Sequence, residues 1–434
     1  MANRPNSPWV QVHAFSRLSR LSLNSLWLLL SRVATQLGMA LFTILLARGL
    51  GSAAFGEYAF MASVIVVGNV LTTFGTDMLL IREIAATGSL KALSSALWLQ
   101  MGLSAPFIGL VFLASAIVRF PDPAAVHALR IYSLSMLPLA FYTVFTTALR
   151  GRQQMLGYAL LNLALMLMQL AAAAWVLRAR GDLIQLAVLL LSVQAAGAVT
   201  AALLCAIQLP DFRGAWGLST SEIASLIKAS APIALLGLLG VIYQRLSLIA
   251  LPWLAGVMAT GLFSAGARLI EAAKIVHLSV FTAIYPAMSA LRNASVDRWA
   301  RDFRAPAMVL LAAAFIGSSG LCLFAAPVVL LLYGAEYGSS IAVVRILAWL
   351  LPAYTINSFL TLAFLARGQE AAIARALALS IIVLIVLMVW WTPAAGAVGA
   401  AWAALFAEVS QAAALVWMDV RGMKMLRAVL TRKA

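Results

Sequence analysis

Long apolar runs recur along the whole chain of 434 residues, and the connections between them are too short to form a soluble domain. A helix needs about 20 apolar residues to cross a hydrocarbon core that is ~30 Å thick. Hydrophobic residues make up 64% of the chain and charged residues only 10%, whereas about 25% of a soluble domain is charged. The sequence therefore predicts an all-α, polytopic membrane protein.

The spacing of the apolar runs predicts about twelve transmembrane helices. They are expected near residues 25–47, 57–81, 94–118, 126–149, 156–177, 184–207, 230–251, 260–290, 305–332, 341–365, 371–391 and 397–417. The chain is expected to consist of a cytoplasmic N-terminal tail, a six-helix lobe, a cytoplasmic linker, a second six-helix lobe and a basic cytoplasmic tail: 1–24, 25–207, 208–229, 230–417 and 418–434. We expect the two lobes to surround a central cavity.

Lysine and arginine are distributed unevenly among the connections between the predicted helices. If the N-terminus is cytoplasmic, 19 of them lie in inward-facing connections and tails, and 4 lie in outward-facing connections. An excess of basic residues in cytoplasmic loops is what orients membrane helices, so both termini are expected in the cytoplasm. The net charge of +16 is spread over these short connections. That placement argues against nucleic acid as a partner.

The chain resembles itself at half its length. The segment 50–58 reads Leu-Gly-x4-Gly-x-Tyr, and the segment 255–263, which lies 205 residues later, reads Ala-Gly-x4-Gly-x-Phe. The predicted fourth and tenth helices also each contain a proline, Pro138 and Pro352. Matches at equivalent places favour two parallel repeats related by an axis along the membrane normal.

Charged residues far from the helix ends are the first candidates for function, because a charge at membrane depth costs at least ~2.5 kcal/mol. Four of them are basic: Arg32, Arg245, Arg268 and Lys274. We interpret them as substrate-binding residues of a cationic cavity, since arginine binds phosphate oxygens through two hydrogen bonds. In the alternative interpretation, Glu271 neutralises Arg268 and Lys274 locally and Arg245 extends outward to the membrane surface.

Glu408, Glu271 and Asp77 are the carboxylates at depth and the candidates for proton or ion coupling. A carboxyl group in a medium of low dielectric constant has a raised pKa and can exchange protons near neutral pH. Neighbouring basic residues oppose that shift at Glu271, so Glu408 is the stronger candidate. The alternative for Glu408 is a structural hydrogen bond to a Ser, Gln or Trp side chain on an adjacent helix.

No pattern in the sequence indicates catalysis, a metal site or a cofactor. His13, His127 and His277 are scattered, without the spacing of metal ligands. Cys205 and Cys322 lie in apolar surroundings and are expected to be small hydrophobic residues. The predicted outer loops are short and nearly uncharged, unlike those of a membrane glycosyltransferase or polymerase that must hold sugar and metal. We therefore expect a transporter without catalytic residues.

Three segments of the first two predicted helices carry a family resemblance: Leu46-Ala-Arg48-Gly-Leu-Gly51-x3-Phe55-Gly56-x-Tyr58, Phe74-Gly75 and Arg82-Glu83-Ile84-Ala85. With them, the sequence resembles the bacterial polysaccharide-biosynthesis flippases of the multidrug/oligosaccharidyl-lipid/polysaccharide exporter superfamily, which include the O-antigen flippases. The resemblance implies two lobes that open alternately to each side of the cell inner membrane. It also implies a cargo of undecaprenyl-pyrophosphate-linked oligosaccharide, carried to the periplasmic leaflet for surface polysaccharide such as lipopolysaccharide.

Related flippases have cationic cavity residues on helices 1, 7 and 8, and Arg32, Arg245 and Arg268 fit that arrangement by helix and depth. Besides the carrier lipid, membrane lipids and other polysaccharide-assembly proteins are candidate partners. One alternative function is a multidrug antiporter of the same superfamily, although Arg32 would repel its cationic cargo. The alternative from another class is an integral-membrane polysaccharide polymerase or ligase.

Overall fold

The structure is a computed structural model, and it describes the backbone of residues 8–117, 122–214, 216–217, 219–290 and 296–418. Within these ranges it leaves undescribed the side chains of residues 8–26, 28–29, 32, 213–214, 275–290 and 296–301. The described part is helical and contains no strand: α1 (Pro8–Thr73), α2 (Thr76–Thr87), α3 (Ala92–Ile117), α4 (Pro123–Ser133), α5 (Met136–Gly151), α6 (Met155–Arg178), α7 (Leu183–Gln208), η1 (Pro210–Gly214), α8 (Thr220–Leu254), α9 (Gly256–Ala290), α10 (Val296–Leu323), α11 (Ala325–Tyr333), η2 (Ala335–Tyr337), α12 (Ser340–Ala348), α13 (Leu350–Ala366) and α14 (Glu370–Met418).

Nine helical segments of the described residues are long and apolar enough to cross a membrane. Two of these segments, Val33–Thr73 and Glu370–Met418, contain 41 and 49 residues and suffice for two spans each. Each is interrupted by a glycine with non-helical backbone angles, Gly51 and Gly396. Helix α9 has 35 residues, three of them charged in its described half, and is also long enough to cross, so the described helices suffice for about twelve spans. The prediction of an all-α, polytopic membrane protein of about twelve helices is confirmed.

The chain forms two compact units. The first contains Met1–Phe42 and Gly68–Ala234, and the second contains Thr43–Val67 and Leu235–Ala434. All three boundaries fall inside helices, two within α1 and one within α8. The stretch of α1 on both sides of Gly51 therefore packs with the second unit rather than with the helices that follow it in sequence.

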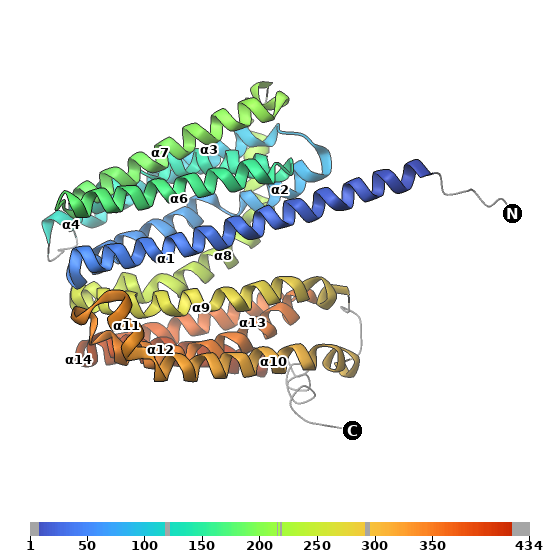
Figure 1. Ribbon diagram of the computed structural model, residues 1–434. Coiled ribbons are helices and arrows are strands. Elements are labelled where there is room, and N and C mark those ends of the chain that lie inside the picture. The colour runs from blue at the N-terminus through green and yellow to red at the C-terminus, as the bar shows by residue number, and fades with distance from the viewer. Residues whose placement is uncertain (1–7, 118–121, 215, 218, 291–295, 419–434) are drawn as a thin grey trace. The chain divides into compact units, whose positions relative to one another are not determined.

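Helices α2 to α7 pack around a continuous apolar core in the first unit, in which α7 contacts α4, α5 and α6 (Figure 1). Fully buried members of this core include Leu93, Val144 and Leu149. The core also takes in Phe212, which lies beyond α7 in η1. The segment that leads to the second unit is thus anchored on the first.

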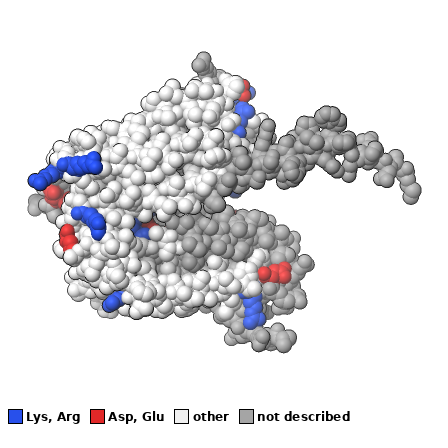
Figure 2. All heavy atoms as spheres, viewed as in Figure 1, with Lys and Arg blue, Asp and Glu red and all other residues white. Residues whose placement is uncertain are grey.

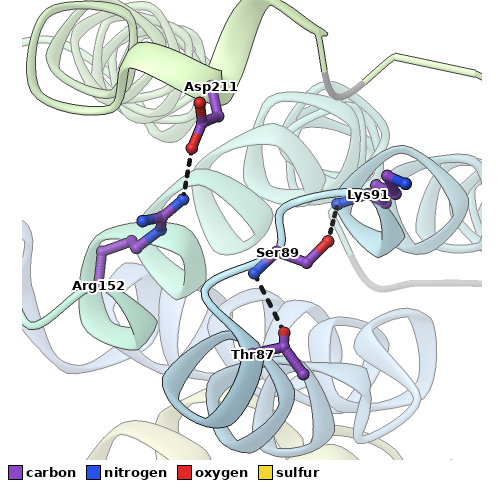
Figure 3. A network of polar contacts seen from close by, with 5 residues as sticks. All are labelled: Thr87, Ser89, Lys91, Arg152 and Asp211. Carbon is purple, nitrogen blue, oxygen red and sulfur yellow. Dashed lines mark hydrogen bonds and ion pairs between the residues drawn. The ribbon is translucent and has the colours of Figure 1, made fainter.

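Polar contacts hold the same segment in place. The guanidinium of Arg152, at the end of α5, forms an ion pair of 2.9 Å with Asp211 of η1 (Figure 3). Nearby, the Thr87 hydroxyl accepts a hydrogen bond from the Ser89 backbone N–H, and the Ser89 hydroxyl accepts one from the Lys91 backbone N–H (Figure 3). These groups close the short connection between α2 and α3.

Helix α9 packs against α12, α13 and α14 in the second unit, and α10 packs against α12 and α13. The prolines predicted to be equivalent in the two halves occupy equivalent places. Pro138 is the third residue of α5 and Pro352 is the third residue of α13, and each helix follows a short break after the preceding helix. Because proline cannot bond to the carbonyl four residues earlier, the Ala348 carbonyl instead accepts a hydrogen bond of 2.7 Å from the Ser318 hydroxyl.

The glycine motifs of the half-length repeat share a backbone conformation. Gly51 has a φ of 79° and Gly256 has a φ of 85°, in the region that side chains strongly disfavour. Gly51 interrupts α1, and Gly256 begins α9 directly after α8 ends. Glycine at both places therefore makes the turn between two consecutive spans.

The second glycine of each motif packs against the other motif, inside the second unit. A Cβ atom on Gly56 would lie 1.9 Å from the carbonyl oxygen of Val257, and a Cβ atom on Gly261 would lie 1.9 Å from that of Ser52. Each glycine thus meets the residue that follows the first glycine of the opposite motif. The two repeats cross backbone to backbone, as small residues allow in membranes.

Large apolar side chains are exposed on both units, including Leu113, Trp175, Ile316 and Val389. Figure 2 shows few charged side chains on the face that it presents, and most of them lie toward the helix ends. A surface that contacts lipid tails has this character, because tails offer no partner for charge.

Candidate functional site

Three of the predicted site residues meet around one carboxylate in the second unit. The Glu271 Oε1 atom lies 3.2 Å from Nη1 of Arg245, and its Oε2 atom lies 2.8 Å from Nη1 of Arg268. Arg245 belongs to α8, and Arg268 and Glu271 stand one turn apart on α9. The turn between α8 and α9 at Gly256 brings the two helices together and makes this cluster possible.

All three side chains are largely withdrawn from the surface. The exposed fraction is 15% for Arg245, 20% for Arg268 and 34% for Glu271. Charges removed from water are tolerated when they are paired and hydrogen-bonded, and one carboxylate serves both guanidinium groups. Arg245 therefore pairs with Glu271, and Glu271 also neutralises Arg268 within α9, as the alternative interpretation supposed for Arg268.

Lys274 has a different partner. Its Nζ atom lies over the ring of Tyr354 on α13, 4.4 Å from the ring centroid. A cation above an aromatic face is stabilised by the ring quadrupole without losing its charge. The side chains of Arg245, Arg268 and Lys274 thus bring three positive charges near a single negative one.

The arginine donors are not all used. The Nε atom of Arg245 is buried and has no hydrogen-bond partner in the described part of the chain. A buried donor without an acceptor is costly, and such a group commonly marks the place of a ligand or a water. The cluster therefore contains one buried donor that no described residue uses.

Two buried tyrosines lie near the cationic cluster. Tyr58 and Tyr333 are 6% and 4% exposed, and both interact electrostatically with Arg268. Tyr58 reaches the cluster because its part of α1 packs with the second unit. Sequence reasoning did not select these tyrosines, and the place of Tyr58 in the repeated glycine motif was the one available signal.

Glu408 lies in a second polar cluster of the same unit. Its Oε2 atom accepts a hydrogen bond of 2.8 Å from the Tyr243 hydroxyl, and its Oε1 atom accepts one of 2.8 Å from the Asn357 amide. The same amide also donates to the Glu408 backbone carbonyl at 2.8 Å. The partners come from α8 and α13, and neither is of the Ser, Gln or Trp type considered from the sequence. Tyr354 interacts with Glu408 electrostatically as well as with Lys274.

Arg32 and Asp77 belong to the first unit, whereas the clusters above lie wholly in the second. Arg32 is a residue of α1, but its side chain lies outside the described residues. Asp77 is half-buried in the first turn of α2, which begins after Gly75. An acidic residue there is favoured by the helix dipole, which is sufficient to account for its place.

The described part of the chain brings together no group of three or more His, Cys, Asp or Glu side chains that is suited to a metal ion. Within that part, the polar clusters at depth therefore combine cations, tyrosines and single carboxylates. Such an arrangement can hold an anion through hydrogen bonds and charge.

Solved transporter structures share this fold. The chain is similar to a multidrug resistance MATE family transporter of the MOP superfamily in an inward-facing conformation, with a TM-score of 0.73 and 15% identity over 92% of this chain and 96% of that chain. It is similar to the lipid II flippase MurJ in an inward closed conformation, with a TM-score of 0.70 and 13% identity over 94% and 90% of the two chains. A MOP superfamily transporter from Pyrococcus furiosus gives a TM-score of 0.63 and 15% identity over 95% and 96%.

A search among curated proteins finds none with a matching sequence. The family resemblance seen in the first helices does extend well beyond them. Residues 21–292 match the family described as polysaccharide biosynthesis protein. Because the match covers more than half of the chain, this protein belongs to the polysaccharide biosynthesis protein family.

Proposed function

We propose that this protein is a flippase that moves an undecaprenyl-pyrophosphate-linked oligosaccharide from the cytoplasmic to the periplasmic leaflet by alternating access. The observation that carries the proposal is that the single carboxylate of Glu271 pairs with both Arg245 and Arg268, while Lys274, on the same helix as Glu271, lies over the Tyr354 ring. Three cations against one anion leave a net positive site among membrane helices. Family membership in polysaccharide biosynthesis supports the same cargo.

The chemistry of the cluster suits a pyrophosphate. Guanidinium groups donate paired hydrogen bonds to phosphate oxygens, and the unpartnered Nε atom of Arg245 is a further donor for such a ligand. The prenyl tail of the carrier would remain in the lipid, where its burial needs no protein.

The alternatives fit these residues less well. A multidrug antiporter with a cationic cargo would meet repulsion at Arg245, Arg268 and Lys274. A polymerase or ligase has to activate a sugar hydroxyl or phosphate, and the cluster offers no acidic pair for that purpose. The single carboxylate at its centre is bound by two guanidinium groups.

For proton or ion coupling we propose Glu408, which belongs to the second polar cluster rather than to the cationic cluster and is 5% exposed. Its hydrogen bonds with Tyr243 and Asn357 would rearrange when the carboxyl group takes up a proton. Glu271 is held by arginines, and Asp77 remains a candidate in the first unit.

We further propose two six-helix lobes around a cavity that Arg32 shares, a cell inner membrane location, and both termini in the cytoplasm. Membrane lipids and other polysaccharide-assembly proteins are the proposed partners.

Replacement of one arginine tests the cargo. We expect Arg268→Ala to abolish complementation of a deletion strain while the protein accumulates normally in the membrane, because one of the two guanidinium groups proposed to bind the pyrophosphate is lost. The matched control is Arg375→Ala, whose parent side chain is exposed on α14 and donates to the Ala371 carbonyl within its own helix. Full surface polysaccharide with Arg268→Ala would count against a cationic substrate site.

A further inference from the structure

We infer that Glu271 is a resident counter-anion: it holds the place of the substrate phosphate in the empty site and competes with it. This inference rests on the proposed function of the cluster. It adds a role for a residue that the sequence suggested only as a local partner or a coupling group. The role is to limit the affinity for pyrophosphate so that the cargo can leave.

The geometry of the bridge supports this role. Each carboxylate oxygen of Glu271 bonds to a different guanidinium, Oε1 to Arg245 at 3.2 Å and Oε2 to Arg268 at 2.8 Å. The two arginines come from different helices, α8 and α9. Two oxygens of one phosphate group can make the same pair of contacts, since carboxylate and phosphate both match the guanidinium fork. Carboxylate and phosphate thus require the same donors and cannot both be fully bound.

The bridge leaves donors that a carboxylate alone cannot use. The Nε atom of Arg245 is buried without a partner, and the Nζ atom of Lys274 lies on the ring of Tyr354 rather than on Glu271. A pyrophosphate has more acceptor oxygens than a carboxylate and carries more negative charge. It can therefore displace Glu271 from both arginines and also engage these remaining donors.

The partial exposure of the carboxylate is compatible with an exchange. Glu271 is 34% exposed, more than either arginine, so its side chain has room to turn away when a ligand enters. After the cargo leaves, the carboxylate can return and neutralise the arginines. Without it, the empty site would hold three uncompensated cations in a poorly solvated place.

The test measures binding of farnesyl pyrophosphate, a short polyprenyl pyrophosphate, to the purified full-length protein in phosphatidylcholine nanodiscs. We expect Glu271→Gln to bind this probe about tenfold more tightly than the wild type and to release it more slowly, because a charged competitor is gone. Complementation of a deletion strain should fall at the same time. Glu370→Gln, an exposed carboxylate at the start of α14, is the matched control and should bind as the wild type does.

Equal or weaker binding by Glu271→Gln would overturn the inference and make Glu271 a residue that orders the arginines. If that variant does not fold, Glu271→Asp decides instead. Its shorter side chain cannot reach both arginines, so tighter binding is expected, and unchanged or weaker binding overturns the inference. A wild type that binds the probe no better than Arg268→Ala would overturn the proposed function itself, and the inference with it.

Discussion

At the scale of single residues, Glu408 is a buried carboxylate that we have proposed as the coupling group. Both of its carboxyl oxygens accept hydrogen bonds, from Tyr243 and Asn357. An ionised carboxylate accepts both without conflict, whereas a protonated one carries its own donor and must lose or turn one bond. Uptake of a proton would therefore loosen contacts of α14 with α8 or α13.

We expect Glu408→Gln to stop coupled transport while binding of farnesyl pyrophosphate remains within about threefold of the wild type. The amide imitates the protonated state and cannot cycle. Complementation is measured in the deletion strain, and probe binding is measured on the purified variant. Glu370→Gln, at the start of the same helix, is the control. Unimpaired complementation by Glu408→Gln would exclude this carboxyl group as the coupling site.

The residues at depth could be selected from the sequence because charge in an apolar run is costly and therefore informative. The pairing of Arg268 with Glu271 one turn away could be foreseen as well, but partners on other helices could not. Glu408 meets Tyr243 and Asn357, which lie 165 and 51 residues away along the chain. An uncharged tyrosine or asparagine in an apolar helix is not a distinctive signal in the sequence, and only packing decides which polar groups face each other. The same limit applies to Tyr354, which pairs with Lys274.

At the scale of elements, the crossing of the two glycine motifs determines how α1 is held by the second unit. We expect Gly56→Ala to destabilise the protein by about 1–3 kcal/mol or more, because the new Cβ atom must push back the backbone at Val257. Gly261→Ala should act similarly through Ser52. Thermal unfolding in detergent measures the effect.

Gly317→Ala is the control for this pair, since a Cβ atom there meets nothing within 4 Å. In a helix, alanine is favoured over glycine by up to about 1 kcal/mol, so this control should be neutral or stabilising. Equal melting temperatures for Gly56→Ala and Gly317→Ala would contradict the close crossing.

Glu336 of η2 caps the part of α1 that begins after Gly51. Its Oε1 atom accepts a hydrogen bond of 2.6 Å from the Ser52 N–H, one of the donors that a helix start leaves unpaired. This bond to the backbone lowers the pKa of Glu336 below its ordinary value of 4.5. The bond therefore stabilises the fold above pH 4.5, and the stabilisation is lost as the pH falls through the lower folded pKa.

We expect Glu336→Gln to have a slightly lower melting temperature than the wild type at pH 7. The loss in free energy of unfolding should be well under ~1 kcal/mol, because the carboxylate is exposed to solvent. The difference should shrink as the pH falls below 4.5. Thermal unfolding at a series of pH values measures it, with Glu83→Gln, an exposed carboxylate of α2, as control. A difference that stays constant with pH would show that the charge of Glu336 takes no part.

The helix boundaries agree with those expected from the sequence where an apolar run ends at a glycine or a polar turn. They differ where a helix is interrupted inside an apolar run. The run expected as one helix near 126–149 is two helices, α4 and α5, because Pro138 interrupts the bonding ladder. The region expected as a linker at 208–229 instead contains η1 and the start of α8 at Thr220. Phe212 packs into the core of the first unit, which no local pattern reveals.

At the scale of the whole molecule, the division into units does not follow the order of the chain. Thr43–Val67 packs with the second unit although both flanking segments belong to the first. The chain therefore passes between the units inside α1, near Phe42, inside the same helix near Val67, and again within α8. The two units are therefore joined through α1 and α8, which also carry Tyr58 and Arg245.

The phenotype of a deletion strain distinguishes a flippase from an enzyme of glycan assembly. Deletion of the gene should remove surface polysaccharide and accumulate lipid-linked repeat units on the inner leaflet, because the net positive site of the second unit would no longer carry them across. A polymerase mutant would still export single units, and loss of a multidrug antiporter would leave the polysaccharide intact and raise drug sensitivity. Leaflet-specific labelling of the lipid-linked units measures this, and restoration by the Arg375→Ala variant but not by Arg268→Ala would tie the defect to the cationic cluster. Repeat units found on the outer leaflet of the deletion strain would contradict transport as the function.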